Sequence, residues 1–358
     1  MSYREIQAVM EHRAPGVVPW NEIFMDVDAQ DKFMPELRGM PPREALFRQI
    51  EFLDNARIAP AGFRTSSKQV ERVEDYVITE SEIGTRVYTH LNPHFSVRVR
   101  YPVADESDLD HLELPDADDP ERYKQAEDDI QFYAQRDFFI EGRVGGFFTG
   151  VWYNLRSIED FLMDMAVSPS FAHRLLEKIG EHHLRIAENL LKRGVHIIVI
   201  SEDMGCTNHP WFSPAMYEEY FQPWHMRLAD LCHRYNAYFR IHSHGYIMPF
   251  VDKVIATGID VLNPVGPGDR MDLAAIKARH GSQIVLFGGL SKFIARMTRE
   301  ELEAHVAEVF EVGTRGGGFM ARNEGGIPVD FPVENLDFYI RTVRKYREKY
   351  GDRGRCRM

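Results

Sequence analysis

The stretch AYFRIHSHG, at residues 237–245, decides the fold of this chain. Its first five residues are mostly apolar and suited to a strand, and two histidines and a glycine follow within four positions. A similar stretch, HIIVISEDMG at residues 196–205, lies earlier in the chain, and a segment with helical spacing separates the two. Short apolar runs that end in polar residues and alternate with helices are typical of parallel strands joined by crossover helices.

The same alternation extends outward from these two stretches. The sequence predicts six strands, at 137–141, 196–201, 237–242, 260–263, 284–288 and 318–322. It predicts helices around them at 157–166, 169–193, 213–235, 246–257, 271–279, 298–313 and 333–349. With one more strand at Val17–Trp20 and another near residue 60, the pattern predicts an α/β fold, a (β/α)8 TIM barrel. A doubly wound sheet is the alternative, but no glycine-rich phosphate loop follows an early strand.

Residues 64–103 have a different character from the rest of the chain. Short valine-rich runs in partial alternation are punctuated there by Gly84-Thr85 and Asn92-Pro93. Alternation with turn residues between the runs predicts antiparallel strands. We therefore expect a small antiparallel β insertion near the N-terminal third of a single barrel domain that spans residues 1–358.

Composition narrows the class of protein. The formal net charge of −12 argues against nucleic acid as a partner, because phosphate binding needs a basic surface. Three scattered cysteines, Cys206, Cys232 and Cys356, do not form a disulfide framework. The polar N-terminus does not resemble a signal peptide, and no apolar stretch is long enough to span a membrane. We expect a cytoplasmic enzyme that acts on a small-molecule substrate.

Polar residues follow the predicted strands, where a parallel barrel carries its chemistry. They are Glu141, Glu202, Asp203, His242, His244, Asn263, Asn323 and Glu324. In an extended segment, residues two apart point the same way, so His242 and His244 could bind one metal ion. Glu202, Asp203, Cys206 or Glu324 could complete the ligand set. The alternative is that His242 is a buried, hydrogen-bonded histidine and His244 an ordinary loop residue.

Other residues near the strand ends have two interpretations each. Glu202 and Asp203 could ligate a metal, orient a histidine or act as general acid and base, whereas Asp203 could instead cap a helix. Trp152 and Tyr153 offer aromatic surface to a planar substrate, or they pack in the interior.

Motifs over most of the chain resemble the uroporphyrinogen decarboxylase family, which includes zinc-dependent methyltransferases that act on methylated corrinoid proteins. The pieces that carry the resemblance are IEDFLMD (158–164), SEDMG (201–205), SPAMY (213–217), HSHG (242–245), GIDVLNP (258–264), IKARHG (276–281), FGG (287–289), GGF (317–319) and PVEN (332–335). The resemblance implies a (β/α)8 barrel with its cleft at the strand C-termini, often in a homodimer.

Within that family, the resemblance is stronger to the methyltransferase-like members than to the decarboxylases. Decarboxylases carry an arginine-rich N-terminal motif for substrate carboxylates, whereas residues 12–22 here hold one arginine, Arg13, and end at Glu22. His242 stands at the first zinc ligand of the methyltransferases, but His244 replaces their first cysteine and Gly325 lies near the second. Without thiolates, the metal would be a harder Lewis acid, better suited to an oxygen ligand.

The sequence thus predicts a methyltransferase-like enzyme that demethylates a small methylated compound and passes the methyl group to a corrinoid partner. We expect zinc or another divalent metal on His242, His244 and Glu324. The expected catalytic residues are Asp203, Glu202, His242 and Tyr153, and the expected substrate-binding residues are Glu141, Trp152, Asn263 and Asn323. A metal-free carboxy-lyase of the uroporphyrinogen type is the alternative, and a non-catalytic binding barrel is the third hypothesis.

Overall fold

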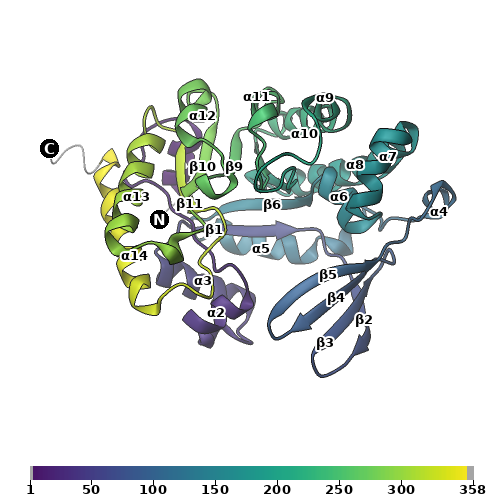
Figure 1. Cartoon of the computed structure of the whole chain (residues 1–358), viewed down its shortest axis with the longest axis horizontal. Coiled ribbons are helices and arrows are strands. Elements are labelled where there is room, and N and C mark those ends of the chain that lie inside the picture. The colour runs from purple at the N-terminus through teal and green to yellow at the C-terminus, as the bar shows by residue number, and fades with distance from the viewer. Residues whose placement is uncertain (1–2, 353–358) are drawn as a thin grey trace.

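A curled, fully parallel sheet forms the centre of the computed structural model, which describes residues 3–352 (Figure 1). Its seven strands follow the order β1-β6-β7-β8-β9-β10-β11, so that each strand pairs with the strand of this sheet that follows it in the sequence. The strands are β1 (Ile58–Gly62), β6 (Phe139–Gly145), β7 (Ile197–Ser201), β8 (Tyr238–His242), β9 (Val261–Val265), β10 (Val285–Leu290) and β11 (Phe319–Asn323). All six strands predicted between residues 137 and 322 are confirmed, with shifts of a few residues at their ends.

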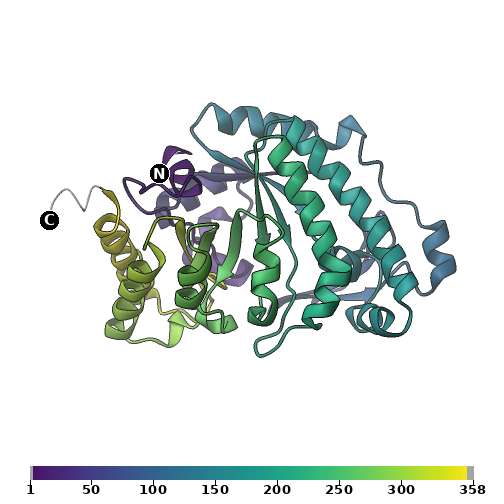
Figure 2. The same ribbon diagram turned by 90° about the horizontal axis from the view of Figure 1, so that it is seen from above.

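Helices cover the outside of this sheet (Figure 2). The α-helices are α1 (Tyr3–Met10), α2 (Val27–Phe33), α3 (Pro42–Leu53), α4 (Glu106–His111), α5 (Lys124–Ala134), α6 (Phe148–Asn154), α7 (Ile158–Val167), α8 (Pro169–Lys192), α9 (Pro214–Met216), α10 (Gln222–Arg234), α11 (Val251–Ile255), α12 (Leu273–His280), α13 (Arg299–Gly313) and α14 (Val333–Lys349). The single helix predicted over 213–235 is divided by a short π-helical segment, Tyr217–Phe221, which separates α9 from α10. None of the helices in residues 3–352 is both long enough and apolar enough to cross a membrane.

The segment around Trp20 closes the gap between the two edges of the sheet. The strand predicted at Val17–Trp20 is wrong in extent, because it forms only an isolated parallel bridge from Trp20 to Ala321 of β11. The Trp20 carbonyl accepts a hydrogen bond from the Ala56 N–H, close to the start of β1. Pro19 lacks an N–H and cannot donate to a ladder, which limits this segment to a bridge. The segment thereby takes the eighth position of a TIM-like barrel.

Strand residues alternate between two hydrophobic layers. Outward-facing side chains such as Ile198, Ile241 and Leu286 pack against the helices in the larger core. Inward-facing side chains such as Val199 and Phe287 form a smaller cluster in the barrel interior. This double burial explains why the strands read as nearly continuous apolar runs in the sequence.

The predicted β insertion is confirmed as a separate four-stranded antiparallel sheet (Figure 1). It runs β2 (Ser67–Arg72), β3 (Tyr76–Ser81), β4 (Arg86–Leu91) and β5 (His94–Arg100) in that order. The sheet projects from the barrel, and every residue of β2 is exposed. Its own backbone ladder and cross-strand contacts hold it together.

Candidate active site

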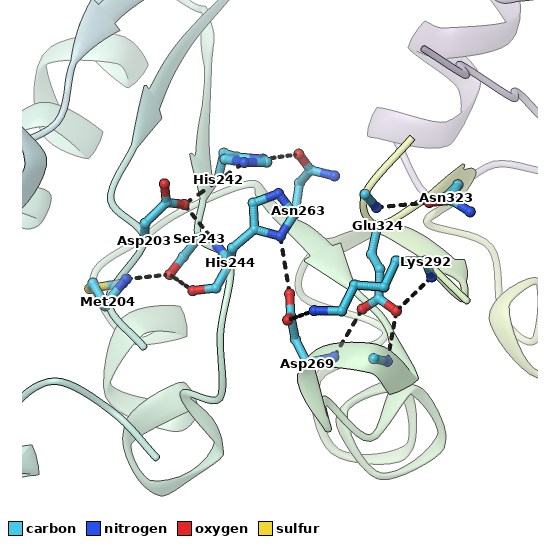
Figure 3. A network of polar contacts seen from close by, with 12 residues as sticks. Asp203, Met204, His242, Ser243, His244, Asn263, Asp269, Lys292, Asn323 and Glu324 are labelled. Atoms are coloured by element: carbon cyan, nitrogen blue, oxygen red, sulfur yellow. Dashed lines mark hydrogen bonds and ion pairs between the residues drawn. The ribbon is translucent and has the colours of Figure 1, made fainter. Parts of the chain in front are cut away.

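The polar cluster lies where β7, β8 and β9 end, on one edge of the barrel (Figure 3). Strand register aligns Ser201 with His242 and His242 with Asn263. Because the three strands are parallel and in register, the residues that follow them meet at the same edge. The structure therefore brings Asp203, His242, His244 and Asn263 together, as the sequence pattern suggested.

His242 is held in one orientation by Asn263. Its Nδ1 lies 2.7 Å from the Asn263 Oδ1, and the Asn263 Nδ2 donates to the Phe287 carbonyl at 3.0 Å. Since that second bond fixes the amide, Nδ1 is the protonated nitrogen and Nε2 keeps its lone pair. Burial, followed by the nearby His244, lowers the pKa of His242 to about 3. The ring is therefore neutral near pH 7 and presents Nε2 as an acceptor.

His244 is oriented by a carboxylate that the sequence analysis did not single out. Its Nδ1 lies 3.0 Å from the Asp269 Oδ2, and the Lys292 Nζ donates to the Asp269 Oδ1 at 2.6 Å. Burial alone would raise the pKa of Asp269, but hydrogen bonds from His244 and Lys292 hold it well below its usual range. The His244 ring is nearly perpendicular to that of His242, with centroids 4.7 Å apart. Within the described residues, the His244 Nε2 makes no hydrogen bond.

Asp203 lies beside both imidazoles in a strained backbone conformation. Its φ of 43° places it in the left-handed region, which non-glycine residues occupy at an energetic cost. The Asp203 Oδ1 accepts the His244 N–H at 3.0 Å and lies 4.0 Å from the His242 Nε2. Burial raises the pKa of Asp203, more than the His244 hydrogen bond lowers it. This carboxyl group can therefore hold a proton at higher pH than an exposed aspartate.

Glu202 turns away from this cluster and serves the backbone. It is fully buried, and its carboxylate accepts the N–H groups of Phe147 and Phe148 at 2.7 and 2.8 Å. The His225 Nε2 lies 2.9 Å from the same carboxylate. These contacts place Glu202 at the N-terminus of α6, where a negative charge is stabilising. The structure places Glu202 in a capping position, because two orphan N–H groups lie within its reach, and the catalytic role expected of it stays a prediction.

The three predicted metal ligands are not assembled as a set. The Glu324 carboxylate accepts the backbone N–H groups of Gly268, Asp269 and Lys292 at 2.6, 3.1 and 3.0 Å. In residues 3–352, no group of three or more histidine, cysteine, aspartate or glutamate side chains is arranged to hold a metal ion. The donor set described therefore offers two imidazole nitrogens without the third ligand that a zinc site needs.

Trp152 and Tyr153 lie on α6, under the inserted sheet. The Arg98 guanidinium of β5 stacks 3.6 Å from the Tyr153 ring centroid, and its Nε donates to the Tyr153 carbonyl. Burial, with a smaller contribution from Asp203, raises the pKa of Tyr153. Because the charge of Asp203 affects the pKa of Tyr153, Tyr153 lies near the cluster. The Trp152 Nε1 is buried without a hydrogen-bond partner among the described residues.

Glu141 and Asn323 have structural contacts rather than open positions. Glu141 lies in the middle of β6, not at its end, because that strand continues to Gly145. Its carboxylate forms a buried bidentate pair with Arg240 at 2.6 and 3.2 Å. Asn323 is fully buried and binds the Ser291 carbonyl and the Gly325 N–H. The substrate contacts predicted for these two residues stay predictions.

A layer of charged side chains, which the sequence pattern did not reveal, lies inside the barrel. Arg240 and Arg322 lie on the inward sides of β8 and β11, and their guanidinium carbons stand 5.4 and 5.7 Å from the Phe287 ring centroid. Two-residue spacing from inward-facing apolar positions, such as Met320 to Arg322, is the signal that could have revealed them.

Comparison with known proteins identifies the class. The family model described as uroporphyrinogen decarboxylase (URO-D) matches residues 75–346. The chain therefore belongs to the uroporphyrinogen decarboxylase family, which confirms the resemblance seen in its motifs.

Individual relatives are distant. The uroporphyrinogen decarboxylase of Vibrio vulnificus (strain YJ016) is 22% identical over 278 residues, 75% of each chain. That of Pseudoalteromonas atlantica is 23% identical over 258 residues, 70% of this chain and 71% of the relative. The match to the Aliivibrio salmonicida enzyme, 22% identical, spans about half of each chain (52%). A solved structure, "methyltransferase from Methanosarcina mazei", superposes with a TM-score of 0.69 at 15% identity, over 97% of this chain and 99% of that one.

Proposed function

We propose that this family member is a methyltransferase that takes a methyl group from a small methoxy or methylamine compound and passes it to a corrinoid partner. The cluster of His242, His244 and Asp203 carries the proposal. It combines two imidazoles whose Nδ1 atoms are engaged by Asn263 and Asp269 with a carboxyl group whose pKa is raised by burial. A departing oxygen or nitrogen needs a proton when its methyl group leaves, and such a carboxyl can donate it.

Each residue of the cluster has a distinct part. Asp203 donates the proton to the leaving atom, and the neutral His242, whose Nε2 lies 4.0 Å from Asp203, accepts a hydrogen bond from the substrate. Asn263 and Asp269 hold the two rings in the tautomer that leaves Nε2 available. The corrinoid, when delivered by a partner protein, would supply the nucleophile that receives the methyl group.

The charges at the mouth favour a small substrate over a porphyrinogen with many carboxylates. Arg240 is paired with Glu141, and Lys292 is paired with Asp269. A substrate with many carboxylates needs several unpaired cationic partners. The methyltransferase named above shares the whole fold, which is compatible with the proposal.

Methyl transfer to free cob(I)alamin tests this proposal. We expect the purified chain to demethylate at least one compound from a panel of methoxylated aromatics and methylamines, seen as growth of the methylcobalamin absorbance. Asp203→Asn should lower the rate by roughly a hundredfold, because general acid catalysis typically contributes 10²–10⁴. The matched control Asp337→Asn alters an exposed carboxylate of α14 and should leave the rate unchanged. No transfer with any compound, or equal rates for Asp203→Asn and wild type, would contradict the proposal.

A metal-free carboxy-lyase is the second candidate, favoured by the raised pKa of Asp203 beside the two histidines. Decarboxylation leaves a carbanion that needs a proton, and Asp203 could supply it. Anaerobic incubation with uroporphyrinogen and chromatography of the products distinguish the two functions. Loss of carboxylate groups from the porphyrinogen would support this candidate over methyl transfer.

Metal binding by His242 and His244 stays a prediction of the sequence. Elemental analysis of the purified wild type and of the variant His242→Ala tests it directly. Stoichiometric zinc in the wild type that is lost in the variant would support the prediction, and a metal-free wild type would contradict it.

A further inference from the structure

Arg322 is the cation at the barrel core that has no hydrogen bond or ion pair to another side chain within residues 3–352. It follows Met320 by two positions on β11, so its side chain lies on the inward face with the Phe287 ring. Its counterpart across that ring, Arg240, is neutralised by a bidentate bond to Glu141. The two guanidinium groups therefore differ in their contacts: the pair with Glu141 leaves only the Nε of Arg240 without a partner, whereas none of the Arg322 donors has a side-chain partner among the described residues.

The groups around Arg322 come from several strands and from the closing segment. Glu22 and Glu141 attract its charge, while Arg240 and Arg143 repel it. Burial is the largest influence and lowers the pKa of Arg322 to about 10, so the side chain is still charged near pH 7. By accessible surface the side chain is partly buried, so its charge is incompletely hydrated, and a bound anion would compensate for the lost hydration.

Glu22 is the nearby acid that could respond to such an anion. It is fully buried, its Oε2 accepts the Tyr339 hydroxyl at 2.8 Å, and its Oε1 accepts the Ile23 N–H at 3.0 Å. Burial raises its pKa to about 7, although Tyr339 and Arg322 both act in the opposite direction. Near neutral pH, this carboxyl group therefore exists in both protonation states.

We propose that Arg322 binds a single carboxylate of the substrate in the barrel core, and that Glu22 takes up a proton when that carboxylate binds. This inference rests on the proposed function, because it takes the barrel core to be the place where the substrate binds. The planar guanidinium fork matches a carboxylate in a bidentate geometry. A second anionic group on the substrate would be repelled by the carboxylates of Glu141, Asp203 and Asp269, and no further unpaired cation is described there to balance it. The substrate class is therefore a monocarboxylate.

The proton follows from charge balance. A carboxylate on Arg322 adds a negative charge beside Glu22 and removes part of the attraction that Arg322 exerts on it, so the pKa of Glu22 rises. Binding then transfers up to one proton from the buffer to Glu22, without any bond to the substrate being made or broken. The affinity for the carboxylate is highest below pH 7 and falls by as much as tenfold per pH unit above it.

Calorimetric titration with benzoate, and with the neutral benzamide as its matched analogue, tests the inference. Titrations in imidazole and in Tris buffer, two cationic buffers that differ in ionisation enthalpy and do not compete for an anion site, count the protons taken up. We expect wild type to bind benzoate but not benzamide, with proton uptake near pH 7. We expect Arg322→Gln to weaken benzoate binding at least about tenfold, as the loss of a charged hydrogen bond implies. The exposed Arg315→Gln of α13 is the matched control.

The variant Glu22→Gln separates the two parts of the inference. It should bind benzoate with the same affinity from pH 6 to pH 8 and without proton uptake. If Arg322→Gln does not fold, Arg322→Lys retains the charge and should keep weakened binding. Equal benzoate affinity in Arg322→Gln and wild type, no benzoate binding by wild type, or binding without proton uptake would overturn the inference. Because these titrations involve no methyl transfer, they do not depend on whether the cob(I)alamin assay succeeds.

Discussion

At the scale of single residues, the group that contacts the Nδ1 of each imidazole decides what the histidine can do. Asn263 and Asp269 occupy the Nδ1 positions of His242 and His244, which leaves both Nε2 atoms available to a ligand. The sequence placed the two histidines at this edge, and strand register confirmed it. It did not reveal Asp269, because that residue lies in a short loop 25 positions away from His244.

Replacing Asp269 should therefore destabilise the fold as well as release His244. Asp269→Asn removes a buried carboxylate that binds His244 and Lys292, and we expect a loss of roughly 1–3 kcal/mol at pH 7. The pKa of Asp269 is depressed in the folded state, so its contribution is present above the unfolded pKa of about 4 and is lost as pH falls through the folded value. Urea unfolding at pH 7 and at pH 4 measures this. A difference between variant and wild type that grows at the lower pH would contradict it.

At the scale of elements, the short helix α6 depends on a carboxylate from the neighbouring strand end. Glu202 supplies acceptors for two N–H groups at the start of α6, and α6 in turn carries Tyr153 toward Asp203. The sequence pattern indicates the paired carboxylates after β7 but not the directions of their side chains. Asp203 has a φ of 43°, and this local reversal sends the two consecutive side chains to different surroundings.

Loss of that cap should weaken α6. Glu202→Gln keeps the size of the side chain but removes its charge and one acceptor, and we expect a loss of about 1–2 kcal/mol. Thermal unfolding followed by circular dichroism measures the change. Glu311→Gln, on the exposed side of α13, is the matched control and should have no measurable effect. An unchanged melting temperature for Glu202→Gln would show that the cap is dispensable.

At the scale of the whole molecule, a charged layer fills the middle of the barrel where apolar side chains would be expected. Glu141 and Arg240 pair across this interior, with Arg322 and Glu22 nearby. The barrel therefore combines an apolar lower layer, which includes Phe139 and Val261, with a polar layer closer to its mouth.

Breaking the central pair should be the most damaging single change. Glu141→Gln leaves the Arg240 guanidinium buried without its counter-charge, and we expect a loss of about 3–5 kcal/mol. The double variant Glu141→Met with Arg240→Met removes both charges, so it should recover much of that loss. Urea unfolding of the single and double variants measures the recovery. A double variant as unstable as the single one would show that the pair contributes net stability.

The amino-acid sequence by itself determined the alternation of strands and helices, the inserted sheet, the family and the edge at which the histidines meet. These follow from local patterns, because apolar runs, turn residues and parallel strand order need no knowledge of distant contacts. Only the tertiary structure decided which carboxylates face the site. Glu202 and Glu324 bind backbone N–H groups, Asp269 holds His244, and within residues 3–352 Arg322 has no hydrogen-bonded side-chain partner. Side-chain direction depends on which donors lie within reach across the barrel, and that information exists only once the strands have closed.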